Sequence, residues 1–121
     1  MAGLTLDDLL VVAARVVGPD VAVRDPGLLV AALARVDAVD DGAEVYPTVG
    51  EKAAALLHSL ASNGALSTGN RPFALAAALA LMGLLDRPAA ISPEAAVALV
   101  TGIVTGRVEG VREIAAALEG R

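Results

Sequence analysis

The stretch that decides the fold is Asn63–Leu85, NGALSTGNRPFALAAALALMGLL. It begins as a polar segment with two glycines and continues into the most apolar run of the chain, mostly alanine and leucine. Both residue types are strong helix formers, so a helix is predicted from near Asn70 to about Asp86, where Arg87-Pro88 ends it. Because this helix is apolar on almost every side, we expect it to be the central rod of the fold.

Capping and stop signals on both sides of this stretch predict five further helices. Four of their starts carry a capping signal: Thr before an acidic turn in two, and Asp or Ser before proline in the other two. The predicted helices run from Thr5 to before Gly18, Asp25 to Val36, Thr48 to about Ser62, Ser92 to Thr105-Gly106, and Glu109 to Leu118. The polar stretch Asp37–Pro47 is expected to be a loop with a short extended segment at Val45-Tyr46. The sequence therefore predicts an all-α, compact single-domain bundle of about six helices over residues 1–121.

Composition narrows the function classes. The chain has 121 residues, no cysteine and a net charge of −5, with its nine basic residues scattered. Scattered basic residues argue against a nucleic-acid partner, and the absence of cysteine fits a reducing cytoplasm. The N-terminus has acids where a signal peptide needs basic residues. The apolar run Phe73–Leu85 is thirteen residues long, whereas a bilayer span needs about 20, so we expect a cytoplasmic protein without a membrane segment.

The loop before the apolar helix is a candidate anion site. Thr68-Gly69-Asn70-Arg71 places a hydroxyl, a glycine backbone, an amide and a cation at a helix N-terminus, where free backbone N–H groups favour phosphate. The alternative is ordinary capping, in which the side chain of Ser67, Thr68 or Asn70 satisfies the first N–H groups and nothing binds. Spacing alone leaves both interpretations open.

The stretch Tyr46–Leu75, YPTVGEKAAALLHSLASNGALSTGNRPFAL, resembles the core of the Fic/Doc (death-on-curing) family. That family carries a loop of the form H-x-F-x-D/E-G/A-N-K/G-R between two helices. The stretch Arg24–Leu29 and the C-terminal segment TGRVEGVREIAAAL are also similar to short Doc-like members, so the resemblance covers nearly the whole chain. It implies a compact helical bundle.

The resemblance also implies a chemistry. Family members transfer AMP, or in the Doc branch a phosphate, from a nucleotide to a hydroxyl of a target protein. The motif His is the general base, the acid holds Mg²⁺, the Gly and Asn cradle phosphate oxygens, and the closing Arg pairs with phosphate. These roles are expectations for this chain only where its residues match.

The match fails at the reactive positions. Gly64 takes the place of the motif His, Thr68 takes the place of the metal-binding acid, and Pro72 takes the place of the closing Arg. Leu66 stands at the position of the aromatic residue, and Arg71 stands at the position of the Lys or Gly. Gly69 and Asn70 match the motif. Glycine cannot accept a proton, and a threonine hydroxyl is a poor Mg²⁺ ligand. No catalytic residue is therefore retained. The prediction is an anion or nucleotide site at Gly69, Asn70 and Arg71 that takes ATP or another nucleotide, with neither Mg²⁺ nor another metal expected.

His58 and Glu109 also fall in stretches that resemble the family. His58 is the sole histidine and is interpreted as a packed, structural imidazole rather than a relocated base. Thr105–Gly110 fits the S/T-x-x-x-E-G/N form by which some Fic proteins inhibit themselves through a Glu–Arg pair. Here Pro72 stands where that Arg should be, so we interpret the match of Glu109 as coincidental.

Three functions follow as hypotheses. The first is a Fic/Doc pseudo-enzyme without ordinary AMP or phosphate transfer, which binds a nucleotide or phosphate, or a protein such as an antitoxin-like peptide. The alternative is a Doc-like toxin of a toxin–antitoxin pair that modifies a protein hydroxyl with altered or relocated residues. The third is a structural or assembly module. Whether the chain is an enzyme stays open at this point.

Overall fold

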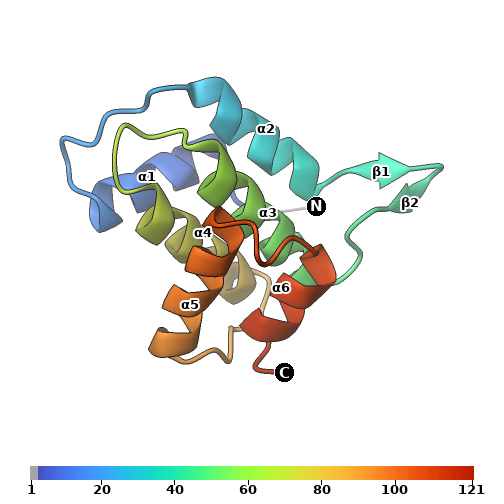
Figure 1. The fold of residues 1–121 in the computed structure, drawn as a ribbon. Helices are drawn as coiled ribbons and strands as arrows, with labels where there is room; N and C mark the ends of the chain where they lie inside the picture. Colours follow the sequence, from blue (N-terminus) through green and yellow to red (C-terminus); the bar gives the residue numbers. More distant parts are fainter. Residues whose placement is uncertain (1–2) are drawn as a thin grey trace.

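Six helices and one short hairpin make up the computed structural model, which describes residues 3–121 (Figure 1). The elements are α1 (Leu6–Val16), α2 (Pro26–Val36), β1 (Val39–Asp40), β2 (Ala43–Glu44), α3 (Val49–Asn63), α4 (Asn70–Leu84), α5 (Pro93–Val104) and α6 (Val111–Leu118). The hairpin points away from the helices at one side of the molecule (Figure 1). The predicted all-α bundle of about six helices is confirmed.

Four helix starts carry the side-chain caps that the sequence predicts. Thr5, Thr48 and Ser92 each accept a hydrogen bond from the backbone N–H three residues on, at the starts of α1, α3 and α5. Asp25 accepts from the N–H of Gly27 at the start of α2. Each cap satisfies a donor that has no partner inside the helix, which fixes where these helices begin.

The central helix is α3, not α4. Helix α3 contacts α2, α4, α5 and α6, whereas α4 contacts α1, α3 and α5. Ten of the fifteen residues of α3 are buried, against six of the fifteen of α4. The expectation that the alanine- and leucine-rich helix is the central rod was wrong, because burial depends on how many neighbours surround a helix and not on its own apolar content.

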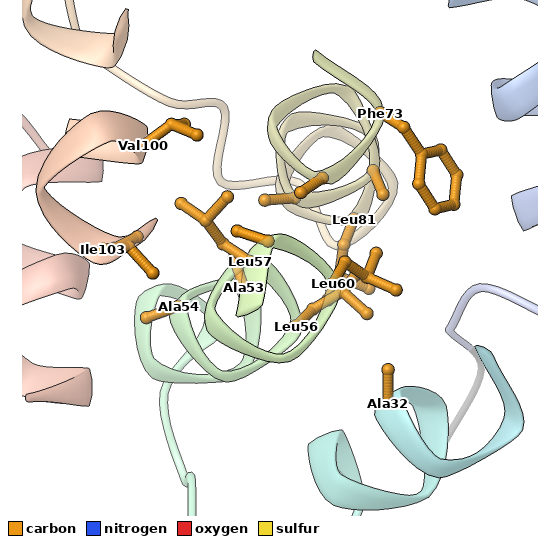
Figure 2. Close-up of a cluster of buried hydrophobic side chains, with 14 of the residues drawn as sticks. Ala32, Ala53, Ala54, Leu56, Leu57, Leu60, Phe73, Leu81, Val100 and Ile103 are labelled. Atoms are coloured by element: carbon orange, nitrogen blue, oxygen red, sulfur yellow. The ribbon is translucent and has the colours of Figure 1, made fainter. Parts of the chain in front are cut away.

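The core is one cluster of buried side chains that draws on all six helices. In Figure 2, Leu57 of α3 faces Val100 and Ile103 of α5, while Leu56 and Leu60 lie on the side toward Ala32 of α2. Most of the other core residues of α3 and α4 are alanines, whose small side chains let the helix backbones approach closely.

The stretch between α2 and α3 differs from its prediction. The extended segments are β1 and β2, which pair antiparallel with Val39 opposite Glu44, and not Val45-Tyr46. Buried Lys52 of α3 donates from Nζ to the Tyr46 carbonyl over 2.7 Å and pairs with Glu44 over 3.1 Å. This lysine ties the base of the hairpin to α3, a tertiary contact that local sequence signals do not reveal.

Within residues 3–121, none of the helices combines the length and the apolar character that crossing a bilayer requires.

Candidate functional site

The segment that connects α3 to α4, residues 64–69, is called the motif loop here. Gly64 ends α3 with φ 61°, and Gly69 precedes α4 with φ 78°. Both angles lie in the left-handed region that glycine adopts without strain. A Cβ on Gly69 would also lie 2.6 Å from Cγ2 of Val17, so both backbone angle and space favour glycine there.

The motif loop is held by the chain segment that precedes α2, which runs beside it (Figure 1). Val23 and Leu66 form an antiparallel β-bridge. The N–H of Arg24 donates to the Ala65 carbonyl over 2.8 Å, and the N–H of Ser67 donates to the Ala22 carbonyl over 2.9 Å. The loop therefore has a defined backbone path that does not depend on a ligand.

Arg24 adds a cation to this end of α3. Its Nε donates to the Gly64 carbonyl over 3.1 Å, and its Nη2 donates to the carbonyls of Gly64 and Asn63. A guanidinium group at these carbonyls complements the negative end of the α3 dipole. A Cβ on Gly64 would lie 3.7 Å from Arg24 Nη2 and 3.7 Å from Asn70 Nδ2, so two N–H donors flank the position where the family places its base.

Asn70 braces the motif loop with its side chain. Oδ1 accepts from the Leu66 N–H over 2.9 Å, and Nδ2 donates to the Leu66 carbonyl over 2.9 Å. Leu66 is buried, so these bonds satisfy two groups that water does not reach. The amide of Asn70 is therefore committed to the loop, and only its backbone N–H remains for a ligand.

Among residues 3–121 no side chain caps the first N–H groups of α4, so the expectation that Ser67, Thr68 or Asn70 caps this helix was wrong. Within residues 3–121, the backbone N–H groups of Gly69, Asn70 and Arg71 donate to no protein atom. A left-handed residue followed by a right-handed one turns successive N–H groups toward a common concavity that suits an anion. The positive end of the α4 dipole adds to this preference.

The predicted site residues line different hollows on the surface around the motif loop. Thr68 lines a hollow of about 380 Å³ together with Ser67 and residues 17–22. Arg71 and Pro72 line another hollow of about 280 Å³, whose walls include Leu75 and Val97. Gly64 lines neither. The structure therefore keeps these positions close in the chain but does not gather them into one pocket.

The residues present do not fit a magnesium ion. Thr68 offers a hydroxyl where the family has a carboxylate. Across residues 3–121, no three His, Asp or Glu side chains come together in a way that could hold a metal. Since Mg²⁺ prefers carboxylate and phosphate oxygens, the protein side of such a site is missing from this loop.

His58 belongs to a polar cluster between α2 and α3. Arg35 donates from Nη1 to His58 Nδ1 over 3.0 Å and to Ser59 Oγ over 2.9 Å, and from Nε to the Tyr46 hydroxyl over 3.0 Å. Since a guanidinium is only a donor, Nδ1 is the acceptor and the neutral ring carries its proton on Nε2. Burial lowers the pKa of His58, the charge of Arg35 lowers it further, and Glu109 opposes both. The ring is thus a packed imidazole in this cluster, and the negative charge of Glu109 shifts its pKa upward against the two lowering effects.

Sequence analysis missed Arg24 and Val17 as parts of this site. In the sequence Arg24 stands out only as part of the stretch Arg24–Leu29 that resembles the family, and Val17 is the C-cap residue of α1. Both residues contact the loop from more than 39 residues away in sequence, and no short-range sequence pattern links them to it. The cap at Asp25 fixes the start of α2 next to Arg24 and is the one local signal that could have drawn attention to it.

Comparison with known proteins supports the family assignment. The chain is 48% identical over 75 residues to Toxin Doc of Mycolicibacterium smegmatis, a match that covers 62% of this chain and 58% of that toxin. The matched stretch is thus shorter than two thirds of the toxin's own length. No family model and no solved structure matches the chain. Over the matched stretch the chain is thus similar to a Doc toxin, which supports its resemblance to the Fic/Doc family.

Proposed function

We propose that this protein is a Doc-lineage pseudo-enzyme whose motif loop binds an anionic group, such as the phosphates of a nucleotide, without transferring it. The observation that carries the proposal is at the start of α4, where the backbone N–H groups of Gly69, Asn70 and Arg71 donate to no atom of residues 3–121. The exposed side chain of Arg71 stands beside them and adds a positive charge. Backbone donors and a cation at one helix start are the features that phosphate recognition uses.

The absence of reactive groups argues against ordinary transfer. Gly64 offers no proton acceptor, and a positioned general base contributes typically about 10²–10⁴-fold to a rate. Thr68 and Pro72 supply neither a metal-binding carboxylate nor a phosphate-pairing guanidinium. A bound metal lowers the activation barrier by several kcal/mol through charge stabilisation. Its loss therefore adds to the loss of the general base.

His58 is a poor substitute for the lost base in this proposal. Its Nδ1 already accepts a hydrogen bond from Arg35, and its ring is packed into the cluster with Ser59. A base must lie within hydrogen-bond reach of the proton that it removes. The motif loop contacts Arg24 and the segment before α2 instead.

A Doc-like toxin that modifies a protein hydroxyl with altered residues is the second candidate. The 48% identity to Toxin Doc favours it, because a toxin of that lineage would be part of a toxin–antitoxin pair. In either case a protein partner, such as an antitoxin-like peptide, is part of the proposal. Growth arrest on expression, relieved by co-expression of the neighbouring small open reading frame, would favour the toxin.

Titration calorimetry tests the first candidate. We expect ATP and ADP to bind with similar affinity with and without Mg²⁺, and Arg71→Ala to weaken binding several-fold. Arg107→Ala is the matched control, because Arg107 is an exposed arginine on the α5–α6 connection. No heat at millimolar nucleotide would reject nucleotide binding and leave protein binding as the function of the fold.

A transfer assay separates the two candidates. Labelled ATP is incubated with cell lysate and the protein, and we expect no label on any protein. Transfer that disappears in His58→Ala would establish an enzyme with a relocated base. A monodisperse monomer that captures neither nucleotide nor protein would instead support the structural module.

A further inference from the structure

We propose that the protein has a second binding surface, a groove beside α6 that docks an acidic, partly apolar peptide segment of a partner protein. The groove, called the α6 groove here, has a volume of about 550 Å³. The chain from Glu44 to Glu51 forms one wall, and α6 with the residues after it forms the other. In Figure 1 the base of the hairpin and α6 lie on the side of the molecule away from the motif loop.

Three arginines from separate parts of the chain line the α6 groove. Arg87 comes from the α4–α5 connection, Arg112 from α6 and Arg121 from the end of the chain. Arg121 pairs with Glu119. Arg87 and Arg112 have no carboxylate within 4.0 Å among residues 3–121. One third of the nine basic residues therefore line a single groove in a chain with a net charge of −5.

The acids of the groove are already engaged. Glu44 pairs with Lys52 over 3.1 Å, and Glu51 accepts a hydrogen bond from the Thr48 hydroxyl over 2.9 Å. Glu119 is paired with Arg121 and packs against Gly50, whose added Cβ would lie 2.8 Å from its carboxyl group. Glu51 keeps its negative charge, because a hydroxyl does not neutralise a carboxylate, so the charged groups of the groove without an ion-pair partner among residues 3–121 are Glu51, Arg87 and Arg112. The two guanidinium groups leave this set with a net positive charge, and guanidinium pairs well with carboxylates.

The groove also offers apolar contact between its charged groups. Val45 is 43% exposed, and Pro47, Ala115 and Ala116 complete the apolar lining. Arginine is among the residues that protein interfaces favour, and apolar contact distinguishes a peptide from a small inorganic anion. A segment that carries carboxylates beside aliphatic side chains matches both features.

The α6 groove and the motif loop lie at opposite ends of α3. Thr48 caps the start of this helix and Gly64 caps its end, and the fifteen residues between them span about 22 Å at 1.5 Å per residue. A partner in the groove would therefore leave the motif loop open. The inference does not depend on whether the motif loop binds a nucleotide.

Fluorescence anisotropy with a short fluorescein-labelled peptide of alternating glutamate and leucine tests the groove. We expect the peptide to bind the wild-type protein, and at least a tenfold loss of affinity in the double variant Arg87→Glu/Arg112→Glu. The double variant Arg15→Glu/Arg107→Glu is the control with the same change in net charge, made at exposed arginines outside the groove. It should bind as the wild type does, and so should Arg71→Ala.

The same anisotropy measurement also tests whether the carboxylates are needed and whether a small inorganic anion binds as well as the peptide does. The matching peptide with glutamine in place of glutamate should not bind, and inorganic tripolyphosphate should compete weakly. If the groove variant is not folded by circular dichroism, Ala116→Glu, which keeps the arginines, should show the same loss. No binding to the wild type, equal loss in the two double variants, or tighter binding of tripolyphosphate than of the peptide would each overturn the proposal.

Discussion

Arg35 donates a hydrogen bond from Nη1 to Nδ1 of His58 over 3.0 Å and thereby joins α2 to the middle of α3. The same guanidinium lies over the ring of Tyr46, 5.5 Å from its centroid, so one arginine also holds the chain that enters α3. A cation directly beside the imidazole opposes protonation of the ring.

This contact predicts a pH dependence of stability. Burial first and Arg35 second lower the pKa of His58 below the ordinary 6.5, although Glu109 acts the other way. Below pH 6.5 the unfolded chain binds a proton that the folded chain does not. The free energy of unfolding therefore decreases as the pH is lowered from 6.5, until the pH lies below the folded pKa of His58. Urea unfolding and an NMR titration of His58 measure both effects.

Two variants check that cause. Arg35→Gln should raise the midpoint of His58 toward its ordinary value, and His58→Gln should remove this part of the pH dependence of unfolding. A wild-type midpoint at or above 6.5 would contradict the prediction.

Substitution of Gly69 should destabilise the fold through both backbone and packing. In Gly69→Ala the new Cβ meets Val17 Cγ2 at 2.6 Å, and the residue sits at φ 78°. We expect a loss of about 2–4 kcal/mol in the free energy of unfolding. Gly106→Ala is the matched control, because Gly106 has φ 81° with nothing within 4 Å, and it should cost only about 1 kcal/mol. Equal losses in urea unfolding would argue against the contact with Val17.

Loss of the Asn70 side chain should loosen the motif loop. Asn70→Ala leaves the N–H and carbonyl of buried Leu66 without partners, at a cost of about 1–3 kcal/mol. Hydrogen exchange at the Leu66 amide should accelerate about tenfold or more. Thr68→Ala, which removes a side chain without hydrogen bonds in the described structure, should leave this exchange unchanged. Unchanged protection in Asn70→Ala would mean that the backbone pairing of residues 22–24 alone holds the loop.

Restoring the motif should restore transfer. We expect the triple variant Gly64→His, Thr68→Asp and Pro72→Arg to gain nucleotide-dependent labelling of a protein, because base and carboxylate return to the motif loop and the guanidinium to the first turn of α4. The φ of 61° at position 64 is tolerated by histidine at a modest cost, and Arg24 Nη2 must accommodate its ring. A folded but silent triple variant would indicate that the motif alignment is shifted.

Local signals accounted for most of the helix boundaries. Thr5, Thr48 and Ser92 cap their helices as predicted, and Gly64 ends α3 in the left-handed conformation. These features depend on residues within one helical turn of each other, which is why a sequence can specify them. The motif loop was likewise found as a loop at a helix start, with its Gly69 and Asn70.

The sequence by itself determined the helical fold, the similarity to a Doc toxin, and the absence of a base at Gly64, because each depends on residue identity or on neighbours in the chain. Only the tertiary structure decided that α3 is central and that Asn70 braces the loop instead of capping α4. The same is true of Arg24, which lies 40 residues from the carbonyl that it bonds. Such contacts form when packing brings distant segments together, and packing is a property of all the helices at once.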